Sequence, residues 1–373
     1  MMGRRGAIRL LGGGSLGLGL AGSPMARAEG AEPARSGRLK ITIAGYKLDR
    51  VAGLIDGRVK VDGCDSQFEI ANIGEMNTHA FSGPQTREVT EIGLSPYMHA
   101  FANDGFRDYS LIPVFPLRVF RHKSIFIRSD RGIAKPADLR GKKIGAAGYS
   151  STSLTWIRGI LQHEYGVGPE DVKWIISSKD SSAKESGIQS KQESLLPEGL
   201  DITSGPDGKD ESAMLADGDV DAVFHAAEPK CFIEGHPLVT RLFADSKGTE
   251  QAYYKNTGIF PIMHAVAIRR DLADARPGFT KAVFDAYSAS KQLAYQRLQR
   301  AAWYQDALPW VSQEFESTRA LMGNNYWAYG IGPNRKALEA LFQYSHEQGL
   351  ASRRLEIEEL FHPSTLDLVE ERS

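Results

Sequence analysis

The sequence predicts an α/β protein of two lobes that are joined by two crossing segments, with a helical region at the C-terminal end. Three observations lead to this fold class. Residues 39–57 have the pattern of a strand, a Gly turn and a short helix, which is how an α/β unit begins. A segment of alternating strand and helix patterns, about residues 130–256, separates two long apolar strand patterns. About 345 residues follow an N-terminal leader, which is more than one hydrophobic core usually serves.

The leader has the order of an export signal. The Arg4-Arg5 pair precedes a Gly-rich apolar run, Leu10–Ala21, that is too short to span a bilayer, and small residues follow it. We expect a signal peptide over residues 1–28, a disordered join over residues 29–38 and a mature protein in the periplasm. The Arg pair and the weakly apolar run favour the twin-arginine route, and an ordinary secretory leader is the alternative.

The first lobe is assembled from segments on both sides of the insertion. Its strand patterns are, in order, Leu39–Ala44, Ser110–Pro116, His122–Arg128 and residues 257–270. Asp49–Ile55 reads as a helix, and from Arg276 the pattern is helical to the end of the chain. We therefore assign residues 39–128 and 257–373 to lobe 1.

The inserted segment, residues 129–256, is assigned to lobe 2. Its elements are a short helix before Gly141, a strand before Gly148, a helix that begins near Ser150, a strand over residues 172–176, a helix over Glu211–Asp217 and a strand over Asp219–His225. Ser177–Asp210 is polar and has no clear period, which indicates an irregular surface excursion. Two lobes with two connections enclose a cleft, and α/β sheets bind ligands beyond the carboxyl ends of their strands. We expect the turns after the strands to face this cleft.

Composition excludes several classes of partner and chemistry. The leader holds four of the 45 basic residues and none of the 46 acidic ones, which leaves 41 against 46 and a net charge of −5. This charge does not attract nucleic acid or a membrane surface, and the chain without its leader is not expected to span a membrane. Cys64 and Cys231 fall in different lobes, so we expect two free, buried thiols and no metal site. No Gly-x-Ser-x-Gly elbow and no His-Glu-x-x-His helix is present, so the sequence does not predict a hydrolase.

Three cationic or titratable side chains lie within five residues, at the start of a crossing strand. In a strand alternate residues share a face, so Arg118 and His122 point one way and Arg121 the other. A guanidinium matches a carboxylate with two parallel hydrogen bonds. We predict that Arg118 or Arg121 binds an acidic ligand, and salt bridges between the lobes are the alternative.

A second candidate anchor is the hydroxyl-rich start of a helix. Ser150, Ser151 and Thr152 follow a strand and a Gly turn, and the exposed N–H groups and dipole of such a helix start favour an anion. Simple capping, which needs only one hydroxyl, is the alternative. Arg158 lies further along the same helix and is a ligand-binding candidate with a structural role as its alternative.

Further candidates stand near other strand ends. Tyr46, Ser95 and Tyr97 follow strand patterns and can bind a ligand through their hydroxyls, and the aromatic rings suit a flat ligand. His225 ends a strand directly above the expected cleft. His264 lies in an apolar crossing strand, where a hydrogen-bonded core residue is the alternative to a functional one.

Several segments together point to one family. They are Gly45-Tyr46 with Asp49-Arg50, Gly93–Met98, Ile112–His122, Ala137–Gly141, Trp156–Gly159 and Thr257–His264. Over about residues 39–300 the chain resembles the 4,5-dihydroxyphthalate decarboxylase-like group of the class II periplasmic binding protein superfamily. The Arg118-x-x-Arg121-His122 segment and Phe260–His264 are the most specific pieces. The resemblance implies a two-lobed class II periplasmic binding protein-like fold and adds Arg50 to the candidate ligand-binding residues.

Two functions from different classes follow. The first is an exported solute-binding protein of an ABC-type uptake system, which closes on a small anionic, aromatic carboxylate ligand and passes it to a permease. The alternative, implied by the resemblance, is a decarboxylase of a hydroxylated aromatic dicarboxylate, in which His122, His264 or His225 protonates the ring carbon. We expect no cofactor for either function.

Overall fold

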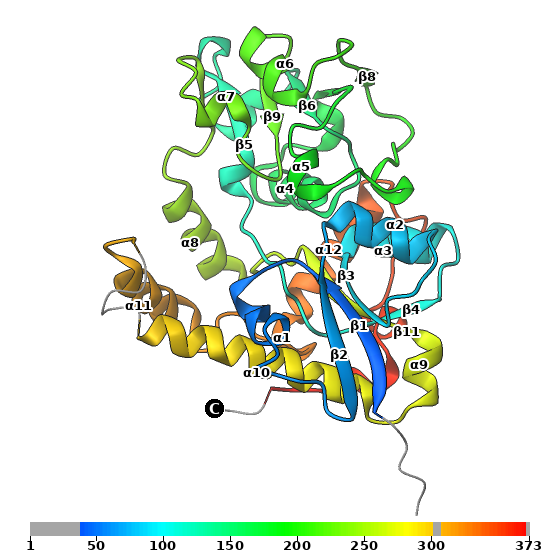
Figure 1. Ribbon diagram of the computed structural model, residues 1–373. Helices are drawn as coiled ribbons and strands as arrows, with labels where there is room; N and C mark the ends of the chain where they lie inside the picture. Colours follow the sequence, from blue (N-terminus) through cyan, green and yellow to red (C-terminus); the bar gives the residue numbers. More distant parts are fainter. Residues whose placement is uncertain (1–37, 301–306, 371–373) are drawn as a thin grey trace, which may run out of the picture. The chain divides into compact units, whose positions relative to one another are not determined.

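The computed structural model describes residues 38–300 and 307–370, and its strands form two sheets (Figure 1). The first sheet has the order β2-β1-β3-β11-β4 and defines lobe 1. Its strands are β1 (Leu39–Gly45), β2 (Cys64–Ile70), β3 (Val89–Gly93), β4 (Tyr109–Ile112) and β11 (His264–Arg269). Strands β2 and β3 run parallel to β1, whereas β11, which returns from the second lobe, runs antiparallel to β3 and β4.

The second sheet has the order β10-β5-β9-β6-β7-β8 and defines lobe 2. Its strands are β5 (Ile125–Arg128), β6 (Lys143–Ala146), β7 (Lys173–Ile176), β8 (Ile202–Ser204), β9 (Ala222–Phe224) and β10 (Val239–Arg241). Strands β6 to β9 are mutually parallel, and β5 is antiparallel to both β9 and β10.

The two chain crossings lie side by side. Residues 117–119 pair with residues 261–263: Arg118 bridges Ile262, and the amide of Met263 donates to the carbonyl of Leu117 at 2.9 Å. Because the chain has crossed by this point, β5 belongs to the second sheet and not to lobe 1, where the sequence pattern placed it. We propose these paired crossings, and not residue 128, as the first boundary between the lobes.

The crossing segments are less regular than the sequence suggested. Pro113, Pro116 and Pro261 have no amide proton for a ladder, and the long strand patterns shrink to β4, β5 and β11. His122–Ser124 forms a turn of 3₁₀ helix. The predicted alternation of faces nevertheless holds along the first crossing, because the turn begins only at its end. Arg121 shares one face with Leu117 and Val119, and the other face carries Arg118, Phe120 and His122.

Helices cover both sheets and make up the predicted helical C-terminal region. Their bounds are α1 (Ala52–Ile55), α2 (Ile73–Phe81), α3 (Leu94–Asn103), α4 (Thr152–Tyr165), α5 (Ala183–Ser186), α6 (Glu211–Asp217), α7 (Lys230–Ile233), α8 (Ser246–Thr257), α9 (Arg270–Ala275), α10 (Phe279–Gln299), α11 (Val311–Met322), α12 (Arg335–Glu347) and α13 (Ile357–Leu360). The helix predicted over Glu211–Asp217 is confirmed as α6. Its Asp210 cap accepts a hydrogen bond from the amide of Ala213, and Gly218 ends it in the left-handed conformation.

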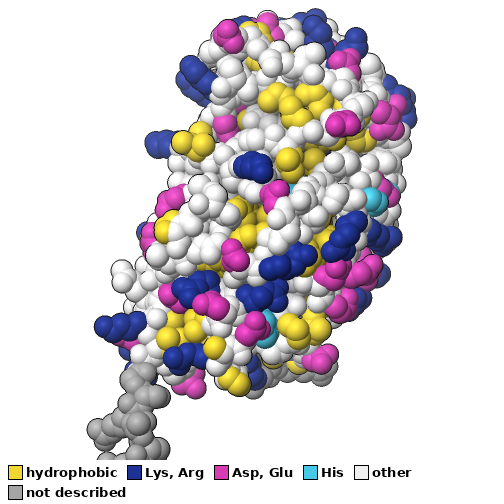
Figure 2. Space-filling view, turned by 90° about the vertical axis from the view of Figure 1, so that its right-hand side faces the viewer, with side chains coloured by type: hydrophobic (Ala, Val, Ile, Leu, Met, Phe, Trp, Pro, Cys, Tyr) yellow, Lys and Arg dark blue, Asp and Glu magenta, His cyan; other side chains and the backbone are white. Residues whose placement is uncertain are grey.

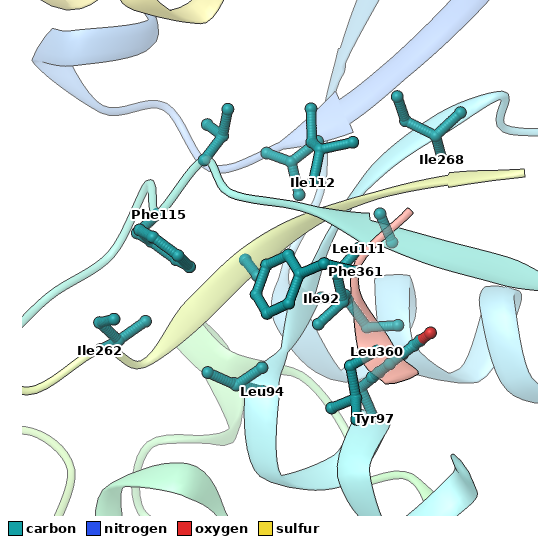
Figure 3. Close-up of a cluster of buried hydrophobic side chains, with 14 of the residues drawn as sticks. Ile92, Leu94, Tyr97, Leu111, Ile112, Phe115, Ile262, Ile268, Leu360 and Phe361 are labelled. Carbon is teal, nitrogen blue, oxygen red and sulfur yellow. The ribbon is translucent and has the colours of Figure 1, made fainter. Parts of the chain in front are cut away.

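The core of lobe 1 combines strands from both ends of the chain (Figure 3). The labelled side chains in that view come from β3, α3, β4, the crossings, β11 and the end of α13; they are Ile92, Leu94, Tyr97, Leu111, Ile112, Phe115, Ile262, Ile268, Leu360 and Phe361. All are buried. Burial of such large apolar side chains contributes roughly 1.5–3 kcal/mol each relative to exposure.

Helix α4 follows a strand of the second sheet but packs into the first lobe. The indole Nε1 of its buried Trp156 donates to the carbonyl of Ile262 at 2.9 Å. Gly159 faces the ring of Tyr344 so closely that a Cβ there would lie 2.0 Å from it. Arg158 donates from Nε to Gln348 at 2.8 Å. These contacts tie α4 to α12 and to a crossing segment.

The remaining expectations on composition concern cysteines and the surface. Cys64 and Cys231 are free and buried, in β2 and α7. On the face shown in Figure 2, Lys and Arg side chains are interspersed with Asp and Glu. Within residues 38–300 and 307–370, no helix is both long and apolar enough to cross a membrane. The predicted signal peptide and most of the join lie outside the described residues.

Candidate functional site

A cavity of about 400 Å³ lies where the strands of both sheets end, which is where the sequence predicted a cleft. Its lining comes from the turns after β1, β6 and β9, the end of β3 and start of β11, the first crossing, and the first turns of α2 and α4. The excursion after β7 supplies a further wall. Of the predicted site residues, Tyr46, Arg121, Ser151, Thr152, His225 and His264 line this cavity.

His264 is held by a buried carboxylate at the edge of the cavity. Its Nδ1 donates to Oε1 of Glu91 at 2.6 Å, and the side chain of Glu91 is only 1% exposed. No hydrogen-bond partner for Nε2 occurs among the described residues, so this nitrogen is free for a ligand. A carboxylate that holds one ring nitrogen fixes the orientation of the imidazole and leaves the other nitrogen to face a ligand. The pair can therefore deliver a proton into the cavity.

Tyr46 covers this pair. Its ring stacks on that of His264 with 5.7 Å between the ring centroids, and its amide donates to Oε2 of Glu91 at 3.0 Å. Burial, with a smaller contribution from the negative charge of Glu91, raises the pKa of Tyr46 to about 12. The hydroxyl stays protonated at neutral pH and can act as a hydrogen-bond donor.

Arg121 brings a buried positive charge to the cavity without a carboxylate partner among the described residues. Its side chain donates to the carbonyl of Ala226 at 2.7 Å, to Oγ of Ser153 at 2.5 Å and to the sulfur of Met263 at 2.9 Å. Burial lowers its pKa to about 9, so the guanidinium remains charged at neutral pH. Neutral oxygens and a thioether are weak acceptors for a cation, and a ligand carboxylate would be a stronger one.

The first turn of α4 adds amide donors beside this cation. Ser151 caps the helix by accepting from the amide of Leu154 at 3.4 Å, while Thr152 accepts from the amide of Ser95 at 3.0 Å. The amides of Thr152 and Ser153 have no acceptor within the described residues. Residues Ser151 to Leu154 line the cavity, so the start of a 14-residue helix contributes its dipole there.

His225 also reaches the cavity, but both of its ring nitrogens are already engaged. Nε2 pairs with Glu211 at 2.7 Å and lies 3.0 Å from Oγ of Ser181, while Nδ1 faces the carbonyl of Ala227 at 2.8 Å. Burial lowers the pKa of His225, but the hydrogen bond and charge of Glu211 outweigh it and raise the pKa overall. With Asp180, this pair forms a group whose ligand atoms lie within 4.8 Å of one another. Its geometry favours a stable ion pair that anchors the excursion.

The excursion after β7 is the part of the site that the sequence reading missed. Interpreted as an irregular surface segment, Ser177–Asp210 instead supplies seven lining residues: Asp180, Ser182, Glu185, Ser186, Gly187, Gln189 and Glu193. It reaches lobe 1 at Tyr46, whose hydroxyl lies 3.5 Å from the carbonyl of Glu185. The segment is polar and shows neither a helix nor a strand period, so its sequence gave no sign that part of it lines a cavity. Glu91 was also missed, although an acidic residue inside an apolar strand is itself a signal.

Three predicted arginines lie outside the cavity lining. Arg118 donates to the carbonyl of Phe260 at 2.7 Å and stacks over its ring, so it braces the crossings. Arg50 pairs with Asp49 and stacks on Trp327. Arg158, described above, packs on Tyr149 at 3.6 Å from the ring centroid. All three have structural contacts in place of a ligand-facing position.

Four other predicted residues are also absent from the lining. Ser95 and Tyr97 are buried in α3, where the hydroxyl of Tyr97 donates to the carbonyl of Tyr109 at 2.8 Å. Ser150 donates to the carbonyl of Gln192 at 3.0 Å. His122 is enclosed by Tyr165, Phe243 and Tyr253, and neither ring nitrogen has a partner among the described residues.

Comparison with solved structures defines the class of fold. The chain is similar to the periplasmic sulfonate-binding protein SsuA of Methylobacillus flagellatus, with a TM-score of 0.52 and 13% identity over 88% of this chain and 93% of that one. It is similar also to the periplasmic aliphatic sulphonate binding protein SsuA of Escherichia coli, with a TM-score of 0.50 and 14% identity over 88% and 99%. A family model described as NMT1/THI5 like matches residues 110–190. The fold is therefore that of a two-lobed periplasmic binding protein, as the sequence predicted.

Sequence comparison identifies the family within this class. A 4,5-dihydroxyphthalate decarboxylase of Comamonas testosteroni is 37% identical over 330 residues, which cover 88% of this chain and 98% of the relative. One of Pseudomonas putida is 36% identical over 224 residues, or 60% of this chain and 84% of the relative. The chain belongs to the 4,5-dihydroxyphthalate decarboxylase family, and the predicted resemblance is confirmed.

Proposed function

We propose that this protein is a decarboxylase of a hydroxylated aromatic dicarboxylate such as 4,5-dihydroxyphthalate. One observation carries the proposal: the His264–Glu91 pair presents an imidazole nitrogen to a cavity that also holds the guanidinium of Arg121. Neither this nitrogen nor this guanidinium has a carboxylate partner among the residues that the structure describes. A proton donor and an anion clamp are the two groups that such a reaction needs. The names of the two relatives support the same reaction.

The reaction can be written with groups of this chain. Arg121 and the first turn of α4 bind substrate carboxylate, and a ring hydroxyl para to the scissile carboxylate raises the electron density of the carbon that bears it. Protonated His264 delivers its Nε2 proton to that carbon, which forms the new C–H bond. The C–C bond then breaks, its electron pair restores the aromatic ring, and carbon dioxide leaves. Solvent returns a proton to His264, so the sum is substrate plus one proton giving the decarboxylated ring and carbon dioxide.

Glu91 has the role of a positioning residue in this scheme. Its carboxylate fixes Nδ1 of His264, so that Nε2 faces the cavity, and balances the charge of the imidazolium. The amide of Tyr46 holds the other carboxylate oxygen, which limits rotation of the Glu91 side chain.

The first test is turnover. We expect the protein to release carbon dioxide from 4,5-dihydroxyphthalate and His264→Gln to lower kcat by roughly 10²–10⁴-fold, the usual contribution of a general acid. His122→Phe is the matched control, since His122 lies outside the cavity, and it should keep its activity. Thermal stabilisation by the compound should persist in His264→Gln. Thermal stabilisation of the wild type by the compound without any release of carbon dioxide would overturn the proposed enzymatic function.

A second candidate is an exported solute-binding protein that hands an anionic aromatic carboxylate to an ABC permease. The leader-like N-terminal residues and the fold shared with two sulfonate-binding proteins favour it. It predicts ligand binding without turnover in the assay above. Export through the twin-arginine route, with the mature chain beginning at Glu29, is part of this proposal, and cell fractionation with N-terminal sequencing tests it.

A further inference from the structure

The cavity wall contributed by the excursion is acidic. Asp180, Glu185 and Glu193 all line the cavity, and no Lys, Arg or His nitrogen of the described residues pairs with any of their carboxylates. A ligand that presents only anionic groups would meet repulsion at this wall. The acidic wall therefore limits which aromatic acids the cavity accepts.

Glu193 is the most firmly placed of these three acids. It is 7% exposed, and its Oε2 accepts from the amide of Ser190 at 3.0 Å and from Oγ of Ser190 at 2.9 Å. Its Oε1 has no hydrogen-bond partner among the described residues. One carboxylate oxygen is thus fixed by the protein, and the other is available to a ligand.

Neighbouring contacts hold the turn that carries Glu193. The carbonyl of Gln192 accepts from Nδ1 of His99 at 3.1 Å and from Oγ of Ser150 at 3.0 Å, and its side-chain amide donates to Asp104 at 3.0 Å. These partners come from both lobes. The position of Glu193 is therefore set by buried structure and does not depend on the exposed part of the excursion.

A carboxylate accepts hydrogen bonds and cannot donate them. The group that a ligand places against Glu193 must therefore be a donor, while its carboxylate is drawn to Arg121. No ion pair joins Arg121 to Glu193, and they share no hydrogen-bond partner, so the cavity keeps its two opposite charges apart. An aromatic ring that carries a carboxylate and a hydroxyl offers an acceptor for Arg121 and a donor for Glu193.

We propose that Glu193 is a specificity-determining residue, whose Oε1 accepts a hydrogen bond from a ring hydroxyl and so selects hydroxylated aromatic acids over unsubstituted ones. The inference rests on the proposed function, because it takes an aromatic acid as the ligand. It extends that function by assigning the hydroxyl-recognising group to a segment outside the predicted site.

Calorimetric titration in the His264→Gln background, where substrate is not consumed, tests the inference. The probes are 4,5-dihydroxyphthalate and phthalate. We expect Glu193→Gln to weaken binding of the dihydroxy compound about 10- to 100-fold, the usual effect of losing a charge-assisted hydrogen bond, and to leave phthalate binding equal or tighter. Glu198→Gln, an exposed change in the same excursion, is the control and should alter neither affinity.

Several outcomes separate this inference from the proposed function. Equal effects of Glu193→Gln on both probes, or no effect on either, would overturn the role of Glu193 while leaving turnover by the wild type intact. Failure of the wild type to bind either probe would overturn the ligand class and both proposals. If Glu193→Gln does not fold, Glu193→Asp keeps the charge on a shorter side chain, and a selective loss for the dihydroxy compound is again expected.

Discussion

Three histidines show how residue environment decides chemical role. Nδ1 of His264 is hydrogen-bonded to Glu91, and its Nε2, which has no partner among the described residues, is free for a ligand in the cavity. His225 has both nitrogens engaged. Neither nitrogen of His122 has a hydrogen-bond partner in the described part of the chain, and burial among aromatic rings lowers its pKa to about 4. Only His264 combines access to the cavity with an unoccupied nitrogen, although the sequence presented all three as candidates.

The environment of His122 predicts a dependence of stability on pH. The pKa of His122 is about 4 in the folded protein and has its ordinary value of 6.5 in the unfolded chain. Between these pH values the imidazole is protonated in the unfolded chain but neutral in the folded one. Stability should fall as pH drops from about 6.5 to about 4, with roughly 3 kcal/mol from this residue. His122→Phe should remove that part of the loss in urea unfolding at pH 7 and pH 4.5. The same acid sensitivity in wild type and variant would contradict the assignment.

At the scale of elements, the excursion is positioned by contact with α2. A Cβ on Gly74, near the start of that helix, would lie 2.1 Å from the carbonyl oxygen of Ile188. Gly187, with φ of +80°, approaches the side chain of Asn72 just before the same helix. Glycine at position 74 thus permits the excursion to close one wall of the cavity.

Gly74→Ala is therefore expected to displace the excursion. Alanine favours a helix more than glycine does, so any destabilisation must come from the clash, at roughly 1–3 kcal/mol. Affinity for 4,5-dihydroxyphthalate should fall together with the melting temperature. Gly332→Ala, where a Cβ meets nothing within 4 Å, is the matched control. If Gly74→Ala bound 4,5-dihydroxyphthalate as tightly as the wild type does, the excursion would not shape the site.

At the scale of the whole molecule, α4 fixes the lobes against each other. Trp156 is buried in the core of lobe 1, and Gly159 packs against Tyr344 of α12. Hinge closure on a ligand would have to break this aromatic contact, because the helix also belongs to the βα pattern of lobe 2. A cavity built across such an interface is preorganised, which suits the proposed decarboxylase.

We accordingly expect the radius of gyration from small-angle scattering to be the same with and without 4,5-dihydroxyphthalate. Gly159→Ala, whose Cβ would meet the Tyr344 ring, should loosen the interface and make the radius depend on ligand. A decrease on ligand addition in the wild type would instead indicate closing lobes and favour the solute-binding function.

The sequence by itself determined the fold class and the family, and several of its candidate residues line the cavity. Strand and helix periods are local, so the order of elements and the helix Glu211–Asp217 followed from them. Arg121 and His264 were candidates because their residue types suit anion binding and proton transfer. The pattern placed Arg118 and Arg121 on opposite faces but did not decide which face meets the cavity, since that depends on how the crossing packs against distant segments.

Only the tertiary structure decided which residues contact the candidate site residues. Glu91 meets His264 across 173 residues of sequence, through pairing of β3 with β11. Glu193 lines the cavity because the excursion packs against α2 and α3. No local helix or strand period predicts this packing. Such contacts depend on how distant segments pack, and a pattern confined to neighbouring residues does not contain that information. The sequence thus indicated which kinds of chemistry its residues can support, whereas tertiary packing determined which of those residues lie close together.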